Sequence, residues 1–228
     1  MMKVRRTRFR IRYYDAFSHV YDRFVAAHSS DREGRVRKAL ADATALEAGD
    51  RVLDICTGTG ALLPVVGQRS GESGLLVGLD FSGGMLRQAK AKLAEMTGVA
   101  LVRADAERLP FRNETFHAVT CSHAFYELKG TGAERTLQET VRVLRPDGRF
   151  LMMEHEVPER PVLRVLFYIR LLSMGLRKAL EVLGHEEALF RRHFRVVEQI
   201  GTETGQSKII MGTLASRRAP TREGTPRP

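Results

Sequence analysis

A short segment near residue 55 combines an acid with two closely spaced glycines. Asp54 lies within an apolar run, and Gly58 and Gly60 follow it before a second apolar run begins. Because glycine has no Cβ, a turn built on these two residues can adopt unusual backbone angles and let a ligand lie against it. Asp80 follows about twenty residues later, where an acid can accept hydrogen bonds from ribose hydroxyls. The spacing predicts a nucleoside-containing cofactor.

The residues around this turn indicate which cofactor. A dinucleotide site requires a third glycine three residues after the second, and Leu63 stands at that position. The carboxylate of Asp54 would repel a pyrophosphate, whereas it suits a ligand that carries an ammonium and a sulfonium group. S-adenosylmethionine has both cations, a ribose for Asp80 and no phosphate. We therefore expect S-adenosylmethionine, with a ligand-free structural turn as the alternative.

Alternating strand and helix patterns supply the framework for these residues. Residues 50–69 predict a strand, a turn and a helix, and apolar runs predict further strands at 75–79, 99–102 and 116–121, and from the Pro-Asp-Gly turn to Glu154. Intervening helices are expected near 14–28, 30–46, 82–96 and 131–144, with Ser82 as an N-cap and 30–33 as a capping box. Two closing strands, 194–200 and 207–214, predict a hairpin. The alternation indicates a mainly parallel sheet with helices on both faces.

The combined motifs resemble those of class I S-adenosylmethionine-dependent methyltransferases, most closely the ubiquinone/menaquinone-biosynthesis C-methyltransferases and related small-molecule and lipid methyltransferases. The resemblance extends over about residues 13–155 and is carried by 52–60, 78–82, 104–111 and 142–154. It implies an α/β, Rossmann-like fold with a doubly wound, mainly parallel seven-stranded sheet and an antiparallel edge hairpin. Asp147 and Glu156 differ from the late signature of the quinone enzymes, so the resemblance leaves the acceptor open.

The resemblance also implies which residues contact the cofactor. In the family an N-terminal helix covers the cofactor, and Tyr14 and Tyr21 lie two helical turns apart on one face of that helix. Phe81 is expected to flank the adenine, and Asp105 to accept from its amino group. The expected contacts are Tyr14, Tyr21, Asp54, Gly58, Gly60, Asp80, Phe81, Met85, Asp105, Ala106 and Ser122. Packing alone is the alternative for the two tyrosines.

Methyl transfer from a sulfonium is an in-line displacement, so most of its acceleration comes from positioning. A base is needed only when the acceptor carries a proton. His123, after the fourth strand, is the first choice because histidine titrates near neutral pH. Tyr126, Glu127 and His155 are the other candidates, since they also follow strand ends. The alternative is that these side chains only line the pocket or cap a helix.

Charge is concentrated at the two ends of the 228-residue chain, whose formal net charge is +10. We expect a basic arm over 1–12, a single methyltransferase domain over 13–215 with a helical insert or lid at about 158–190, and a disordered basic tail over 216–228. Basic ends favour anionic surfaces such as phospholipid headgroups or nucleic acid. The alternative is that they only make the protein more soluble.

No apolar run reaches the roughly 18 residues that span a membrane, and no secretory signal is evident. We therefore expect a cytoplasmic protein, with peripheral attachment to the inner membrane face as a further expectation. Cys56 and Cys121 are expected to be free thiols. No metal is expected, because a zinc site built from these cysteines and His123 would lack Cys-x-x-Cys spacing.

These observations favour a methyltransferase that acts on a small, apolar or lipid-linked acceptor, quinone-like or phospholipid-like. Two alternatives remain open: an RNA methyltransferase that uses the basic ends, and a non-catalytic cofactor-binding protein. No RNA-binding module is recognisable, so a nucleic-acid partner is not favoured. The acceptor atom and the oligomeric state stay open, because fold does not determine function in such a superfamily.

Overall fold

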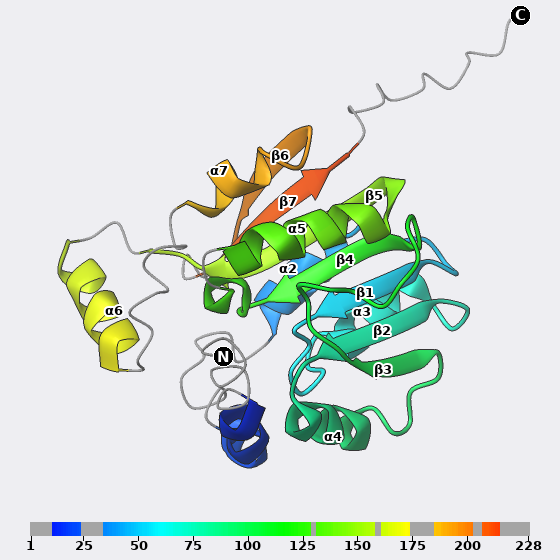
Figure 1. Ribbon diagram of the computed structural model, residues 1–228, viewed down its shortest axis with the longest axis horizontal. Helices are drawn as coiled ribbons and strands as arrows, with labels where there is room; N and C mark the ends of the chain where they lie inside the picture. The colour runs from blue at the N-terminus through cyan, green and yellow to red at the C-terminus, as the bar shows by residue number, and fades with distance from the viewer. Residues whose placement is uncertain are drawn as a thin grey trace, which may run out of the picture.

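The computed structural model describes residues 11–23, 34–128, 131–157, 161–173, 185–202 and 207–214. In these residues seven strands form one sheet in the order β3-β2-β1-β4-β5-β7-β6 (Figure 1). The strands are β1 (Arg51–Ile55), β2 (Leu75–Asp80), β3 (Val99–Arg103), β4 (Phe116–Ser122), β5 (Leu144–His155), β6 (Val196–Gly201) and β7 (Ser207–Thr213).

Helices flank both faces of this sheet. They are a helix over residues 11–23, α2 (Arg35–Ala43), α3 (Leu63–Ser70), α4 (Gly83–Lys92), the short 3-10 helix η1 (Phe125–Glu127), α5 (Thr131–Val143), α6 (Pro161–Ser173) and α7 (Glu186–Phe190). Successive residues of β1 enter different cores, because side chains alternate across a strand. Leu53 packs with Leu137 of α5, whereas Val52 packs with Leu40 of α2. The central strands are therefore buried on both faces, as parallel strands usually are.

The pairing confirms the expected topology. β1 to β5 pair in parallel, and β7 pairs antiparallel with both β5 and β6. The chain first winds outward from β1 to β3 and then returns to β4 on the other side of β1. This reversal creates a switch point beside the carboxyl ends of β1 and β4, which is where open α/β sheets bind ligands.

Several element boundaries differ from expectation. Helix α2 ends at Ala43, short of residue 46, because Ala45 adopts a φ of 47° that cannot continue a right-handed helix. The capping box predicted at 30–33 lies outside the described residues. Residues 24–28, predicted to end the first helix, also lie outside them. Helix α4 ends at Lys92, before residue 96.

The expected Pro-Asp-Gly turn is part of strand β5. Leu144 pairs with Phe116, and the next recorded pair is Arg149 with Ala118, so residues 145–148 stand opposite a single residue of β4. Such an irregularity bends a strand without ending it. β5 is therefore one strand from Leu144 to His155, and its carboxyl end lies beside that of β4.

The segment after β5 contains α6 and α7, inside the expected insert at 158–190. Figure 1 shows α6 standing off the sheet beyond the end of β5, and the helix over residues 11–23 beside α4. Among the described residues, no helix has the length and apolar character needed to cross a bilayer. The arm before residue 11 and the tail over 216–228 lie outside the described residues.

Candidate active site at the switch point

The carboxyl ends of four neighbouring strands bring polar residues to one edge of the sheet. Asp54 is on β1, Asp80 ends β2, Ser122 ends β4 and Glu154 is the penultimate residue of β5. The parallel pairing of these strands puts their carboxyl ends side by side. Two groups of residues result, one at β1 and β2 and one at β4 and β5.

The loop after β1 has an open backbone surface. Gly58 has a φ of 56°, and a Cβ at this residue would meet no atom within 4 Å, so a ligand has room to lie against the peptide. Gly60 differs, because its Cβ would lie 2.9 Å from Leu93 Cδ1 and 3.2 Å from Ala89 Cβ. The absent side chain of Gly60 lets helix α4 pack closely, and only Gly58 offers the open face.

Asp80 joins the two loops of the β1–β2 group. One carboxylate oxygen accepts from the backbone N–H of Gly58 at 2.9 Å, and the other from that of Ser82 at 2.8 Å. Ser82 in turn caps α4, since its hydroxyl accepts from the N–H of Met85 at 3.2 Å, as expected for an N-cap. Each carboxylate oxygen has two lone pairs, so Asp80 can also accept from hydroxyls of a ligand.

Asp54 lies beneath the loop rather than on its surface. Its side chain is buried and accepts from the hydroxyls of Thr57 at 2.6 Å and Thr120 at 2.7 Å. Burial, together with the charge of Asp80, raises the pKa of Asp54 to about 6, even though the two threonine hydrogen bonds favour the charged form. Direct contact between Asp54 and a cationic ligand remains a prediction, and its charge would act from below the loop.

The helix over residues 11–23 is fastened across both cofactor loops. Asp15 accepts from Ser82 Oγ and from the N–H of Gly84, both at 2.7 Å. A Cβ at Gly84 would lie 2.6 Å from Asp15 Cα, so only glycine allows this approach. Burial opposes the charge of Asp15, but these hydrogen bonds together with the charges of Arg103 and Arg87 outweigh it and lower the pKa of the carboxyl. Asp22, seven residues later, accepts from Thr59 Oγ1 at 2.6 Å and pairs with Lys92 at 2.7 Å.

Asp15 and Asp22 were not among the predicted site residues. Their signal in the sequence is the repeated Tyr-Asp pair, Tyr14-Asp15 and Tyr21-Asp22, at a spacing of two helical turns. The prediction considered only the tyrosines of each pair. The acids carry the contacts because their short side chains reach the hydroxyl and N–H donors at the start of α4 and in the β1 loop.

Tyr14 connects the N-terminal helix to the acceptor side of the site. Its hydroxyl donates to Glu127 Oε1, and its ring packs edge-on against Phe81 with 5.6 Å between centroids. Burial, with the nearby charges of Glu127 and Asp80, raises the pKa of Tyr21 to about 12. Both tyrosines therefore lie near the strand ends, whereas their contact with the cofactor remains a prediction.

The remaining predicted cofactor residues surround the same edge. Met85 is buried in the first turn of α4, and Ser122 is half-buried at the end of β4. Asp105 lies on the loop after β3, where its side chain accepts from the N–H of Glu107 at 3.0 Å, and Ala106 beside it is buried. The loop after β3 lies next to the end of β2, because the N–H of Ala104 donates to the carbonyl oxygen of Asp80 at 3.1 Å, and adenine recognition would require this arrangement.

The second group of residues lies at the ends of β4 and β5. His123 and His155 have ring centroids 4.5 Å apart, and the ring of Tyr126 lies 5.9 Å from that of His155. His123 has a φ of 49°, an unusual value for a residue with a side chain. All three predicted catalytic residues therefore come together, although the sequence separates His155 from the others by some thirty positions.

Glu154 is the residue of this group that the prediction missed. It is fully buried, with one oxygen 3.7 Å from His123 Nδ1, and its carboxylate accepts from the N–H groups of Tyr126 and His155, both at 3.2 Å. Burial raises the pKa of Glu154 to about 7, against the opposing effect of His155 and of the hydrogen bonds. Its signal was an acid at the end of an otherwise apolar strand segment, residues 150–153.

His123, Glu154 and His155 could also hold a metal ion. Their ligand atoms all lie within 4.8 Å of one another, and two histidines with one carboxylate suit zinc or non-haem iron. Among the described residues, this is the group of histidine, cysteine or acidic side chains whose ligand atoms lie close enough to share one ion. It does not include the cysteines. Cys56 and Cys121 are free thiols, and their hydrogen bond and burial raise the pKa of Cys121.

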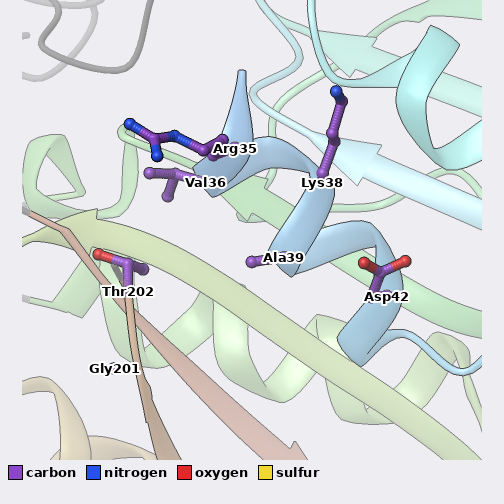
Figure 2. Close-up of a pocket in the computed structure, with 7 residues that line it drawn as sticks. All are labelled: Arg35, Val36, Lys38, Ala39, Asp42, Gly201 and Thr202. Atoms are coloured by element: carbon purple, nitrogen blue, oxygen red, sulfur yellow. The ribbon is translucent and has the colours of Figure 1, made fainter. Parts of the chain in front are cut away.

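A cavity of about 400 Å³ lies elsewhere, between α2 and the end of β6 (Figure 2). Its lining comes from the residues Arg35, Val36, Lys38, Ala39, Asp42, Gly201 and Thr202. None of the predicted site residues takes part. The chemistry described above therefore belongs to the strand ends and not to this cavity.

Comparisons with known proteins agree with this arrangement. A profile of the methyltransferase domain matches residues 52–148. A demethylmenaquinone methyltransferase of Shouchella clausii (strain KSM-K16) is 30% identical over 162 residues, which cover 69% of this chain and 68% of the relative. One of Clavibacter sepedonicus is 34% identical over 151 residues, covering 66% of this chain and 60% of the relative.

Solved structures share the fold. A chain from the complex of the Haloferax volcanii Trm112 methyltransferase activator with a methyltransferase has a TM-score of 0.68 at 19% identity, with 89% of this chain and 98% of that chain covered. An S-adenosylmethionine-dependent methyltransferase of Aquifex aeolicus has a TM-score of 0.62 at 19% identity, with 85% and 98% covered. With these relatives and this fold, the chain belongs to the class I S-adenosylmethionine-dependent methyltransferases and is related to the menaquinone-biosynthesis group.

Proposed function

We propose that this methyltransferase acts on a small apolar or lipid-linked acceptor, quinone-like or phospholipid-like, held at the ends of β4 and β5. The observation that carries the proposal is the pairing of His123 with the buried Glu154, next to Tyr126 and His155. The relatives named demethylmenaquinone methyltransferases support a quinol as the acceptor. Their similarity extends over 69% and 66% of this chain, which supports the same acceptor class.

The loops after β1 and β2 fit S-adenosylmethionine. The open backbone face at Gly58 leaves room for it, and Asp80 has lone pairs for its ribose. When bound, the cofactor supplies an electrophilic methyl group on a sulfonium. Asp15 and Asp22 hold the N-terminal helix over these loops, which excludes water from the site and fixes the position of the ligand.

His123 takes the proton that the acceptor must lose. A quinol carbon becomes nucleophilic when a neighbouring hydroxyl ionises, and an amine when its ammonium is deprotonated. Glu154 holds the imidazole from the buried side and favours its protonated form after the transfer. Tyr126 and His155 complete the wall of this acceptor site. In this proposal a single catalytic domain spans residues 13–215.

The test is a transfer assay with a radiolabelled methyl donor and three separate acceptors: a long-chain demethylmenaquinol, phosphatidylethanolamine and bulk tRNA. We expect label in one of the two apolar acceptors and none in tRNA, with His123→Ala as the inactive control. Label in tRNA would replace the proposal with the RNA alternative. Tight cofactor binding without transfer to these acceptors or to fractionated lipid extract would favour a non-catalytic protein.

A further inference from the structure

Helix α6 exposes an aliphatic stripe. Val162, Val165 and Ile169 are 72%, 56% and 56% exposed, the highest values of any large apolar side chains in the described residues. At 3.6 residues per turn their directions fall within about 60° of one another. Exposed aliphatic residues gathered on one helical face are unusual on a soluble surface and mark a contact site. We name Val162, Val165 and Ile169 the outer stripe.

The opposite face of α6 meets the acceptor site. Phe167 is half-buried, and its ring lies 6.4 Å from that of His155 in an edge-on arrangement. Phe167 points roughly 140° or more away from each residue of the outer stripe, by the same helical geometry. One thirteen-residue helix therefore borders His155 on one side and presents an aliphatic surface on the other.

The charges of this region favour an anionic surface. The sequence of α6 contains Arg164 and Arg170 and no acidic residue, and the side chain of Arg164 is exposed. The chain as a whole has a formal net charge of +10. By the geometry of the helix, Arg164 points about 100° or more away from each residue of the outer stripe. A helix with aliphatic residues on one face and basic residues on its polar side typically lies in the interface of a bilayer that contains anionic lipids.

We propose that α6 docks the enzyme on the surface of an anionic phospholipid bilayer through its outer stripe, and that an apolar acceptor enters from the bilayer along α6 toward His155. The outer stripe supplies the apolar contact, the excess of basic over acidic residues in α6 and in the whole chain favours the anionic surface, and Phe167 borders the entry route. The docking rests on the exposed aliphatic residues of α6 and on the charge of the helix and chain, and it does not depend on the proposed function. The entry of the acceptor also rests on the proposed function.

The docking is tested with the full chain and vesicles of phosphatidylcholine, with or without phosphatidylglycerol, in a sedimentation assay without cofactor or acceptor. We expect binding to the mixed vesicles that falls with salt, and a loss of about tenfold or more in Val165→Asn/Ile169→Asn. Leu75→Asn is the matched control, because Leu75 is 40% exposed at the opposite end of the sheet. Its binding should match that of the unmodified chain.

Equal vesicle binding by the stripe variant and the control overturns the docking, as does a stripe variant that changes the oligomeric state instead. Entry of the acceptor is tested with demethylmenaquinol in vesicles and in detergent micelles. The stripe variant should lose kcat/KM with vesicles and keep it with micelles. An equal loss in both overturns the entry route, whereas absence of transfer by the unmodified chain, with vesicle binding intact, counts against the proposed function and leaves the docking standing.

Discussion

Two buried carboxylates, one near the end of β1 and one near the end of β5, have different surroundings and therefore different chemistry. Asp54 accepts from two threonine hydroxyls, which hold it in place beneath the cofactor loop. Glu154 accepts from backbone N–H groups and lies beside His123. The threonine hydroxyls beside Asp54 can only hydrogen-bond to its carboxylate, whereas the imidazole beside Glu154 can take up and release a proton. Of the two, Glu154 is the acid placed to influence proton transfer.

The role of Asp80 is tested by Asp80→Asn, which keeps the shape of the side chain and removes its charge. We expect cofactor binding to weaken by about 1–3 kcal/mol, because a charge-assisted hydrogen bond to the ribose is lost. Titration calorimetry with S-adenosylmethionine measures this loss. Asp147→Asn is the matched control, since the side chain of Asp147 is 75% exposed in the bulge of β5. Unchanged affinity in Asp80→Asn would remove the ribose assignment.

The proton-transfer role of His123 and Glu154 predicts a pH profile. In the unmodified enzyme kcat/KM should rise with pH as His123 loses its proton beside Glu154, whose own pKa is about 7. In Glu154→Gln the midpoint should move to lower pH, because the histidine loses the carboxylate that favours its protonated form. His123→Ala should lower kcat by about 100-fold or more while cofactor affinity stays the same. An unchanged midpoint in Glu154→Gln would show that Glu154 does not act on the titrating group.

Dialysis against a chelator distinguishes a base from a metal ligand at His123. If His123 removes the proton as proposed, activity should survive treatment with EDTA. A loss of activity that zinc or iron restores would show that His123, Glu154 and His155 act as a metal site, which their mutual distances permit. Metal analysis of the purified protein supplies the independent measurement.

At the scale of elements, the N-terminal helix is the part that closes the cofactor site. Its acids reach the start of α4 through Ser82 and Gly84, and the loop after β1 through Thr59. These contacts join segments more than thirty residues apart, so the repeated Tyr-Asp pattern marks the two acids but does not report their partners. Local patterns did predict the N-cap of α4, because Ser82 caps a helix that begins at the next residue.

Asp15→Ala should loosen this closure. The substitution removes two hydrogen bonds, one of them to a backbone N–H of α4, and we expect cofactor affinity to fall by about 1–3 kcal/mol. Amide exchange over residues 11–23 should become faster at the same time. Asp42→Ala serves as the control, because Asp42 pairs with Arg69 on the surface between α2 and α3. Exchange that is equally slow in Asp15→Ala would mean that other contacts hold the helix.

At the scale of the whole molecule, buried acids make stability depend on pH. The pKa of Glu154 in the folded state, about 7, is above its unfolded value, so the folded state holds a proton that the unfolded state has released. The free energy of unfolding therefore decreases as the pH rises from about 4 to about 7, by up to about 1.4 kcal/mol per pH unit for this group. Asp54 contributes in the same direction up to about pH 6.

Urea unfolding at several pH values tests this dependence. Glu154→Gln imitates the protonated form, so it should match the unmodified protein near pH 4 and become relatively more stable as the pH approaches 8. The exposed Glu95→Gln should show no such trend. A difference between Glu154→Gln and the unmodified chain that is constant across this pH range would contradict the raised pKa.

The sequence alone determined the order of the elements, the mainly parallel sheet with its edge hairpin, and the cofactor class. These depend on local signals: alternating apolar runs, the glycines after Asp54 and the acid at residue 80. Only the tertiary structure decided that Glu154 lies behind His123, that Asp15 and Asp22 fasten the first helix, and that Gly60 serves packing. Each of these is a contact between residues distant in the chain, and such contacts depend on how strands and helices stack, which residue spacing does not report.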